Sequence, residues 1–346
     1  MLSLNGESSY IHFPDEGVTI FCGSQQIESA DIVTSEIVTN LDIAPWLNPK
    51  LCAVENTIEV CGKIRKMLNP CPCFDISLHL ENLDSLNIQK ILAIPHLMPS
   101  QIIEVFSSEI DKADLDLIME KGSDALRVLL YVKKFPDSYY HDHAFKFNSF
   151  QYDDAHWVKI EHLLSFRCRT YVTLNNCPFT PVDLNRLIKH WINGDADMFQ
   201  HLILNCIDSR PTGFTEILID GLVTLRTFVN GRSLHLFAIA IPSLLRRYKL
   251  LSCWRGANNR ITFSAIPIKV KHAHHNMPPR IGKLEYQILR RLNSKKKLQD
   301  EIVEKRENNP RDRSILQLEE KIQEIDRKLI MKGVNLDFQV PILPEL

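Results

Sequence analysis

The sequence predicts an α/β fold in which short strands and helices alternate in a leucine-rich-repeat-like solenoid, followed by a C-terminal helical hairpin. Two alternating apolar runs, 171–175 and 201–205, both end in Leu-Asn. They recur at an interval of about 30 residues, which is typical of repeat architectures. The near-continuous apolar run 125–132 is typical of a strand that is covered on both faces. A solenoid explains the recurrence directly, because each strand–helix unit buries its helix against its neighbours.

The segment 180–194 between those two strands predicts a well-defined helix. Thr180 suits the N-cap, Pro181 the first helical position and Asp183 the first turn, and Asn193-Gly194 indicates the end. Apolar residues at three- and four-residue spacing form one stripe, namely Leu184, Leu187, Ile188 and Trp191. Because Trp191 lies on this stripe, we interpret it as a core residue, with a partner contact as the alternative.

Upstream, strand and helix patterns alternate along the chain. Periodicity predicts strands at 11–13, 18–21, 74–80 and 145–148. It predicts helices near 58–68 and 86–92, a further helix that Ser100 opens and that runs through Val105 and Phe106, and another that starts at Asp153-Asp154 and carries Trp157, Ile160, Leu163 and Leu164. We expect three regions: an N-terminal α/β segment at 1–73, a repeat-like α/β domain at 74–280 and a helical hairpin and tail at 281–346.

The C-terminal region has the pattern of two helices. Apolar residues follow 3-4-3-4 spacing in the second helix, at Ile315, Leu318, Ile322, Ile325 and Leu329. Asn308-Asn309-Pro310 separates it from a helix that carries Leu284, Ile288, Leu292, Leu298 and Ile302. A hairpin formed within the chain is the simplest arrangement. Docking of these helices on another chain and a mobile tail are the alternatives.

Size and composition indicate an intracellular protein of the cytoplasm or nucleus. The 346 residues are 45% hydrophobic, enough to bury a substantial core, and the net charge of −1 gives no global attraction to nucleic acid or anionic membranes. No apolar run approaches the roughly 20 residues that span a bilayer. Nine scattered cysteines favour reduced thiols over a disulfide framework.

The sequence predicts neither catalysis nor a cofactor nor a metal. His141-Asp142-His143 and His272-Ala273-His274-His275 carry suitable nitrogens, but neither has a second half at structural zinc spacing. Cys71-Pro72-Cys73 resembles a loop, and the chain has no glycine-rich phosphate loop and no Gly-x-Ser-x-Gly elbow. The basic clusters at Lys269-Val270-Lys271-His272 with Arg280, and at Lys295-Lys296-Lys297, favour solvated faces, so nucleic-acid binding is the weakest interpretation.

One segment resembles a known family. His162-Leu163-Leu164-Ser165 before Cys168, Leu184-Asn185, the run 189–194 and the strand 199–204 make residues 157–204 similar to the F-box-associated domain, of the second type, found in nematode F-box proteins. Residues 227–232 weakly resemble the strand–turn–strand element that follows it. The signature residues, which we expect to be structural, are Leu184, Asn185, Lys189, His190, Trp191 and Gly194.

The resemblance implies a non-enzymatic protein-recognition module that delivers protein substrates to a cullin-based, SCF-type ubiquitin ligase. Members usually begin with an F-box, a helical module rich in Leu and Pro that docks on Skp1. Residues 1–45 depart from this pattern, because they carry strand-like runs and no such helical run. The alternative is an adaptor or scaffold without Skp1 contact that pairs through its C-terminal helices.

Overall fold

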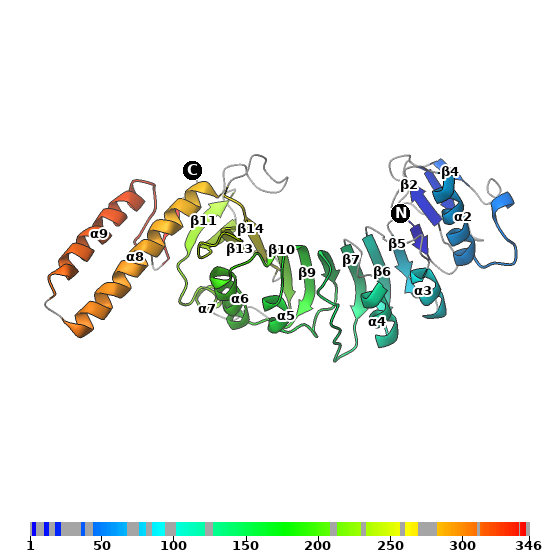
Figure 1. Cartoon of the computed structure of the whole chain (residues 1–346), viewed down its shortest axis with the longest axis horizontal. Coiled ribbons are helices and arrows are strands. Elements are labelled where there is room, and N and C mark those ends of the chain that lie inside the picture. The colour runs from blue at the N-terminus through cyan, green and yellow to red at the C-terminus, as the bar shows by residue number, and fades with distance from the viewer. Residues whose placement is uncertain are drawn as a thin grey trace. The chain divides into compact units, whose positions relative to one another are not determined.

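The computed structural model is a mixed α/β structure, as the sequence predicts (Figure 1). It describes residues 2–4, 10–13, 18–21, 36–38, 44–67, 76–80, 85–93, 102–121, 127–207, 213–229, 233–256, 260–268, 282–309, 312–338 and 340–343. The chain divides into two compact units. Unit 1 comprises Met1–Trp157 with Thr173–Asn176, and unit 2 comprises Val158–Val172 with Cys177–Leu346.

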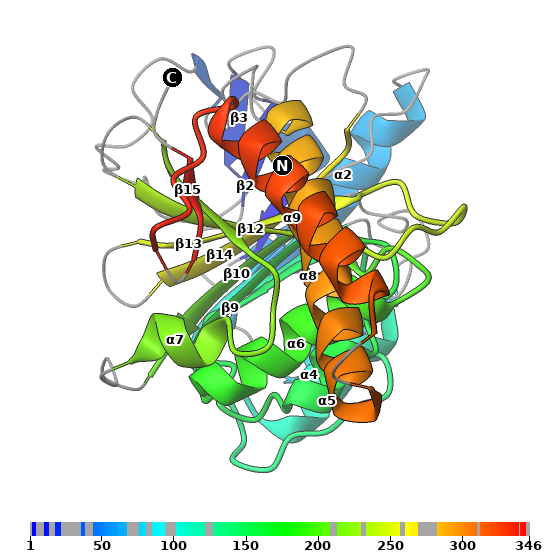
Figure 2. The same ribbon diagram turned by 90° about the vertical axis from the view of Figure 1, so that its left-hand side faces the viewer.

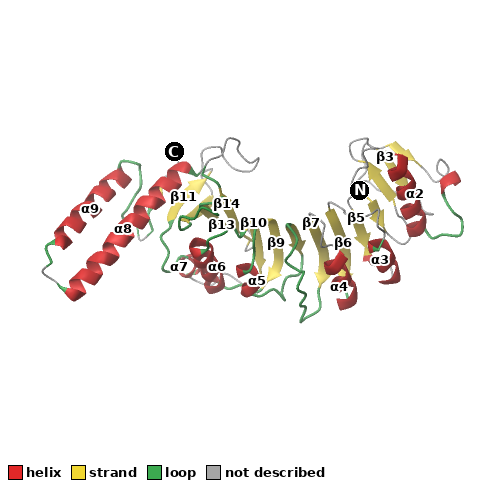
Figure 3. Ribbon diagram, in the orientation of Figure 1, coloured by secondary structure: helices red, strands yellow, loops and turns green. Residues whose placement is uncertain are grey.

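Unit 1 contains a series of parallel strands joined in chain order. The elements are β5 (Ile76–His79), α3 (Ser85–Leu92), β6 (Ile102–Glu109), α4 (Lys112–Lys121), β7 (Arg127–Lys134) and β8 (Ser149–Tyr152). Each strand pairs in parallel with the next, and strands and helices alternate from β5 to β7 (Figure 3). Strands and helices therefore alternate in this part of the chain.

The parallel register aligns three rings across β5, β6 and β7. His79 pairs with Phe106, and Phe106 pairs with Tyr131. Their ring centroids lie 4.9 Å and 4.7 Å apart, and all three side chains are half-buried. On the alternate positions of β6, Ile103 and Val105 are fully buried. Since successive side chains point to opposite faces of a strand, one face of this sheet is packed and the other carries the rings.

The N-terminal part of unit 1 adds further strands to β5. These are β1 (Leu2–Leu4), β2 (Tyr10–Phe13), β3 (Val18–Phe21) and β4 (Glu36–Val38), followed by η1 (Ala44–Trp46) and α2 (Ala53–Met67). β1 is parallel to β5 and antiparallel to β2, β2 and β3 are antiparallel, and β3 and β4 are parallel. The predicted strands at 11–13 and 18–21 and the helix near 58–68 are confirmed.

Unit 2 has a different strand pattern. β9 (Arg169–Cys177), whose residues Thr173–Asn176 belong to unit 1, and β10 (Phe199–Cys206) flank α6 (Pro181–Asn193), as expected. α5 (Ile160–Leu164) precedes them and α7 (Phe214–Leu218) follows them. The later strands are β11 (Leu225–Val229), β12 (Ser233–Ile239), β13 (Leu250–Arg255), β14 (Arg260–Ile266) and β15 (Ile342–Leu343). The run β11-β12-β13-β14-β10 is antiparallel throughout, unlike the parallel run from β5 to β8.

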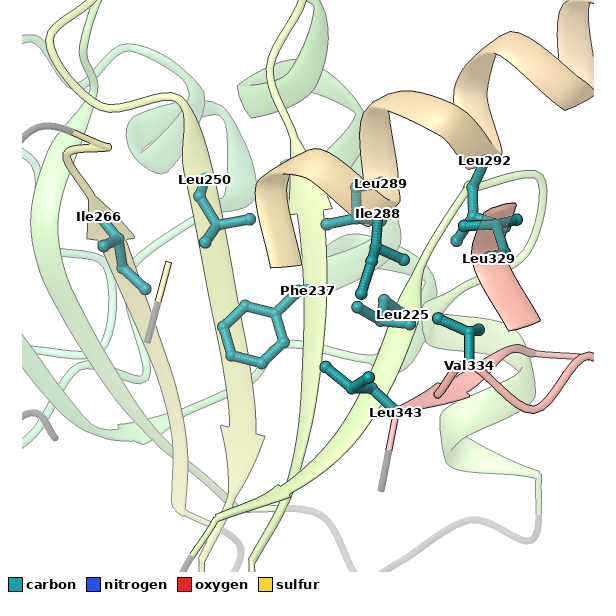
Figure 4. Close-up of a cluster of buried hydrophobic side chains, with 10 residues drawn as sticks. All are labelled: Leu225, Phe237, Leu250, Ile266, Ile288, Leu289, Leu292, Leu329, Val334 and Leu343. Atoms are coloured by element: carbon teal, nitrogen blue, oxygen red, sulfur yellow. The ribbon is translucent and has the colours of Figure 1, made fainter. Parts of the chain in front are cut away.

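The C-terminal helices α8 (Lys283–Asn308) and α9 (Ser314–Ile330) lie side by side (Figure 2). Two clusters of apolar side chains hold them. The first joins the start of α8 and the end of α9 to the antiparallel sheet and contains Leu225, Phe237, Leu250, Ile266, Ile288, Leu289, Leu292, Leu329, Val334 and Leu343 (Figure 4). The second lies between the two helices and contains Ile302, Ile315 and Leu318, with Leu298 and Ile322 packed against it.

The helix predicted to run through Val105 and Phe106 is wrong, because this segment is strand β6. Ser100 itself lies outside the described residues. Ile103 and Val105 are buried while Ile102 and Glu104 are only half-buried, which is the alternation of a strand. β-branched Ile and Val favour this conformation, and parallel neighbours on both sides stabilise it.

Two predicted elements before α5 are also wrong. The strand expected at 145–148 lies instead at β8, because Phe147 is buried in the preceding turn. The helix expected to start at Asp153-Asp154 begins only at Ile160. Residues 154 and 155 make other contacts instead. The Asp154 carboxylate accepts the Phe135 backbone N–H at 2.9 Å, and the Ala155 N–H donates to the Asn175 carbonyl at 2.8 Å.

Candidate protein-interaction site

Helix α6 begins at Thr180, as the sequence predicts. The Thr180 hydroxyl accepts the Asp183 backbone N–H at 3.2 Å, and the Asp183 carboxylate accepts the Thr180 backbone N–H at 2.9 Å. This reciprocal capping satisfies two donors at the helix start. The predicted apolar stripe is buried, with exposed fractions of 4% or less at Leu184, Leu187, Ile188 and Trp191. The helix is therefore fixed at its start and along one face.

Asn185 ties α6 to the segment around α7. Its side chain is buried, and its amide nitrogen donates to the Leu218 carbonyl at 2.8 Å and to the Asp220 carbonyl at 3.0 Å. Lys189 lies one turn further along, and a Cβ on Gly221 would sit 3.4 Å from its Nζ. Gly221 has a φ of +70°, a conformation that glycine adopts without strain. Both family-signature side chains thus lie against the 218–221 segment.

At the end of α6, the backbone of Gly194 lies close to the carbonyl of His190. The Gly194 N–H donates to the His190 carbonyl at 2.9 Å, and a Cβ at Gly194 would lie 3.1 Å from that oxygen. A larger residue would crowd this contact, which explains the glycine. The His190 side chain itself is half-buried.

Arg246, which the sequence does not single out, completes the packing around Trp191. Its guanidinium carbon lies 4.1 Å from the centre of the Trp191 ring. The same guanidinium donates hydrogen bonds to the carbonyls of Trp191 and of Gly194, the second at 3.1 Å. Burial lowers the pKa of Arg246, and the carboxylates of Asp197 and Asp195 oppose that shift. No local pattern in the sequence points to this role of Arg246.

The loop at 241–247 is held firmly at its base. The Ile241 N–H donates to the Ile192 carbonyl at 2.9 Å, and the Ser243 hydroxyl donates to the Asp195 carbonyl at 2.9 Å. The Asp197 carboxylate accepts the backbone N–H of Arg247 at 3.0 Å and that of Tyr248 at 3.2 Å. These acceptors lie just beyond or within the last turn of α6.

This anchored loop presents two adjacent leucines to solvent. Leu244 is fully exposed, and Leu245 is 74% exposed. We call residues 241–247 the leucine tip. Exposed apolar side chains on a fixed backbone are suited to bind an apolar surface of another protein, since little conformational freedom is lost on binding. Arg247, also exposed, adds a cation beside them.

The remaining candidate residues fall into two groups. The cysteines at 71 and 73, the histidines at 272, 274 and 275, and the basic residues 269–271 and Arg280 lie outside the described residues. In the second basic cluster, Lys295 Nζ lies 2.6 Å from the Asp326 carboxylate and Lys296 Nζ lies 2.8 Å from that of Asp300. These ion pairs agree with a solvated helix face.

No helix in the described part of the chain is both long and apolar enough to cross a membrane.

A family model described as F-box associated matches residues 141–204. The matched segment contains α5, β9, α6 and most of β10, and it includes the acceptors on which the leucine tip rests. The chain matches no curated protein and no solved structure. The family match confirms the resemblance that the sequence carries over residues 157–204 and begins 16 residues before it. Residues 141–204 of this chain are therefore similar to the F-box-associated family.

Proposed function

We propose that this chain is a non-enzymatic protein-recognition module and that the leucine tip is its main contact with a protein substrate. The observation that carries the proposal is the exposure of Leu244 and Leu245 on a loop anchored to the F-box-associated segment. Burying a leucine side chain stabilises a complex by about 1.5–3 kcal/mol. Leu244 and Leu245 would be the buried apolar anchors of a small interface, and the neighbouring cation of Arg247 would lie in its polar rim.

The contact can be tested by comparing captured partners. Proximity labelling in cells would be carried out with the wild-type chain and with Leu244→Asp/Leu245→Asp. Leu316→Asp serves as the matched control, because Leu316 is also an exposed leucine but lies on α9. A protein labelled by the wild type and the control but lost with the tip variant would then be purified and titrated directly. Equal labelling by all three chains would reject the leucine tip as the contact.

We further propose that recognition serves a cullin-based, SCF-type ubiquitin ligase, as similarity to the F-box-associated family suggests. The described part of residues 1–43 consists of strands β1 to β4, so Skp1 contact is not assigned to it. A pull-down with purified Skp1 decides this point, with a standard F-box grafted at Met1 as the positive control. Binding by the native chain supports the ligase function, whereas binding by the graft alone supports recognition apart from a ligase.

A second candidate is an adaptor that pairs through its C-terminal helices. The supporting observation is a set of exposed apolar side chains on α8 and α9 and directly after α9, namely Val303, Leu316, Ile330 and Met331. In the labelling experiment this function predicts the opposite outcome. The partner would be lost with Leu316→Asp and kept with the tip variant.

Three further proposals concern organisation. We propose that the steps from β5 to β8 form a short leucine-rich-repeat-like solenoid within a domain that spans residues 74–280, and that the protein acts inside the cell. We also propose that the six signature residues are structural. Burial of Leu184, Asn185 and Trp191 and the close approach at Gly194 support this role. Limited proteolysis would support the domain limits if it released a stable fragment whose ends lie near residues 74 and 280.

A further inference from the structure

We propose that Glu120, His141 and His143 in unit 1 bind a divalent transition-metal ion, with Zn²⁺ as the cation that fits best. Glu120 lies at the end of α4, and the two histidines lie in the turn after β7. One ligand atom from each residue lies within 4.8 Å of the other two. The sequence shows the two histidines, but their third partner lies 21 positions upstream of His141, so no zinc spacing is visible.

The two distances from Glu120 match the edges of a tetrahedral site. Glu120 Oε1 lies 3.3 Å from His141 Nε2 and 3.5 Å from His143 Nδ1. Ligands bound to zinc at about 2.0–2.1 Å in tetrahedral geometry are separated by about 3.3–3.4 Å. The ligand atoms of the two histidines lie within 4.8 Å of each other, so a cation can sit between the three atoms once the two rings adjust.

The two segments that supply the ligands are held together by Tyr152. The Tyr152 hydroxyl donates to the carbonyl of Ala144, in the histidine turn, and lies 3.8 Å from Sδ of Met119, which precedes Glu120 in α4. The turn has its own backbone hydrogen bonds, from the Ala144 N–H to the His141 carbonyl and from the Lys146 N–H to that of His143, both at 3.1 Å. The two backbone segments that carry the ligands are thus held close to each other before any ion binds.

The hydrogen bonds of the His141 and His143 rings are also compatible with metal binding. His143 Nδ1 is buried and has no hydrogen-bond partner among the described residues. His141 Nδ1 accepts the His143 backbone N–H at 3.1 Å, which places the ring proton on Nε2, beside Glu120. On metal binding this proton moves to Nδ1 and the amide contact is given up. The backbone bonds of the turn remain, so three metal ligands replace this hydrogen bond and the direct contacts of Glu120 with the two rings.

The ligand set selects the ion. Two imidazoles and one carboxylate suit Zn²⁺ and related transition metals, whereas Ca²⁺ and Mg²⁺ require mostly oxygen ligands. The Glu120 side chain is 56% exposed and that of His143 is 42% exposed, so the site opens to solvent. A water molecule can fill the fourth position. The ion would join the end of α4 to the turn in which the F-box-associated segment begins.

Zinc stoichiometry of the full chain tests the site. Isothermal titration with Zn²⁺ would compare the wild type with His141→Asn/His143→Asn and with His274→Asn/His275→Asn, a control that removes two imidazoles elsewhere. The expected result is one equivalent fewer for the first variant and no change for the control. Glu120→Gln, with both histidines kept, should weaken zinc binding at this site at least tenfold. His143→Asn alone, at a partly exposed side chain, is the second variant if the double variant fails to fold.

A second measurement distinguishes this site from other histidines. Co²⁺ titrated into the wild type should give the visible absorption of a tetrahedral ion, and that absorption should be absent from His143→Asn. The proposal is overturned if the wild type binds no zinc. It is also overturned if the zinc equivalent survives in both variants of the site, whatever the control shows.

Discussion

The guanidinium carbon of Arg246 lies 4.1 Å from the centre of the Trp191 ring, so a cation covers the buried aromatic residue at the end of α6. The same side chain donates to the carbonyls of Trp191 and Gly194. Arg246 therefore contacts the core of unit 2 and the end of α6, and it lies at the base of the leucine tip.

Arg246→Ala should lower the free energy of unfolding by about 2–4 kcal/mol, because it leaves two backbone acceptors without a donor and removes the cation from the ring. Chemical denaturation measures the change. Arg247→Ala is the matched control, since its exposed side chain should shift stability by no more than about 0.5 kcal/mol. Similar losses in both variants would contradict the anchoring role.

Trp191→Ala should lower the free energy of unfolding by about 3–5 kcal/mol, the usual loss when a large buried ring is removed. Val182→Ala, on the exposed side of the same helix, controls for the change in helix content. Thermal unfolding followed by circular dichroism gives both values. A stable Trp191 variant that loses a captured partner would move this residue from the core to the interface.

Asn185→Asp should loosen the 218–221 segment. The substitution keeps the side-chain shape but replaces the amide donor with a carboxylate, so two carbonyl acceptors face a negative charge. We expect a loss of about 2–3 kcal/mol and faster hydrogen exchange in α7. Exchange rates in the α8–α9 hairpin provide the internal reference. Unchanged protection around Leu218 would show that these hydrogen bonds do not hold the segment.

Leu318→Asp should destabilise the C-terminal hairpin, because Leu318 is 6% exposed and packs in the cluster between α8 and α9. Leu316→Asp, two residues away and 65% exposed, should leave the melting temperature nearly unchanged. Differential scanning calorimetry compares the two. Equal melting temperatures would argue that the hairpin contacts contribute no stability.

Stability should fall as the pH drops below about 6.5, the ordinary histidine value. Burial lowers the pKa of His235, and burial together with the positive charge of Lys159 lowers that of His162. Both rings therefore bind protons more readily in the unfolded chain, which favours unfolding in acid. His235→Gln should flatten the pH dependence of urea denaturation. An unaltered slope in the His235 variant would remove its contribution.

The sequence predicts elements well where a local pattern agrees with the environment. Helix α6 has a capping residue, a proline at its first position and an apolar stripe, and its bounds agree with the structure. The segment at β6 lacks that agreement. Its apolar residues at 102, 103, 105 and 106 fit either periodicity, and only the parallel neighbours on both sides select the strand.

The interaction and metal sites depend on contacts between residues far apart in the sequence. Arg246 meets Trp191 across 55 positions, and the hydrogen-bonded base of the loop is what leaves Leu244 and Leu245 exposed. Glu120 lies beside histidines that are 21 and 23 positions away, and Tyr152 contacts both segments. A pattern of local spacing contains none of these distances. Sequence reasoning could therefore identify the family signature but not the surfaces beside it.

The aligned rings of His79, Phe106 and Tyr131 have a consequence for how such a chain can change during evolution. Each ring occupies the equivalent place on its strand, and each strand pairs with the next in the same sense. Duplication or deletion of one whole step would leave its neighbours with the same pairing partners and the same ring to stack on. We expect lineages of this gene to vary in length by complete steps, while shorter insertions within a strand are eliminated by selection.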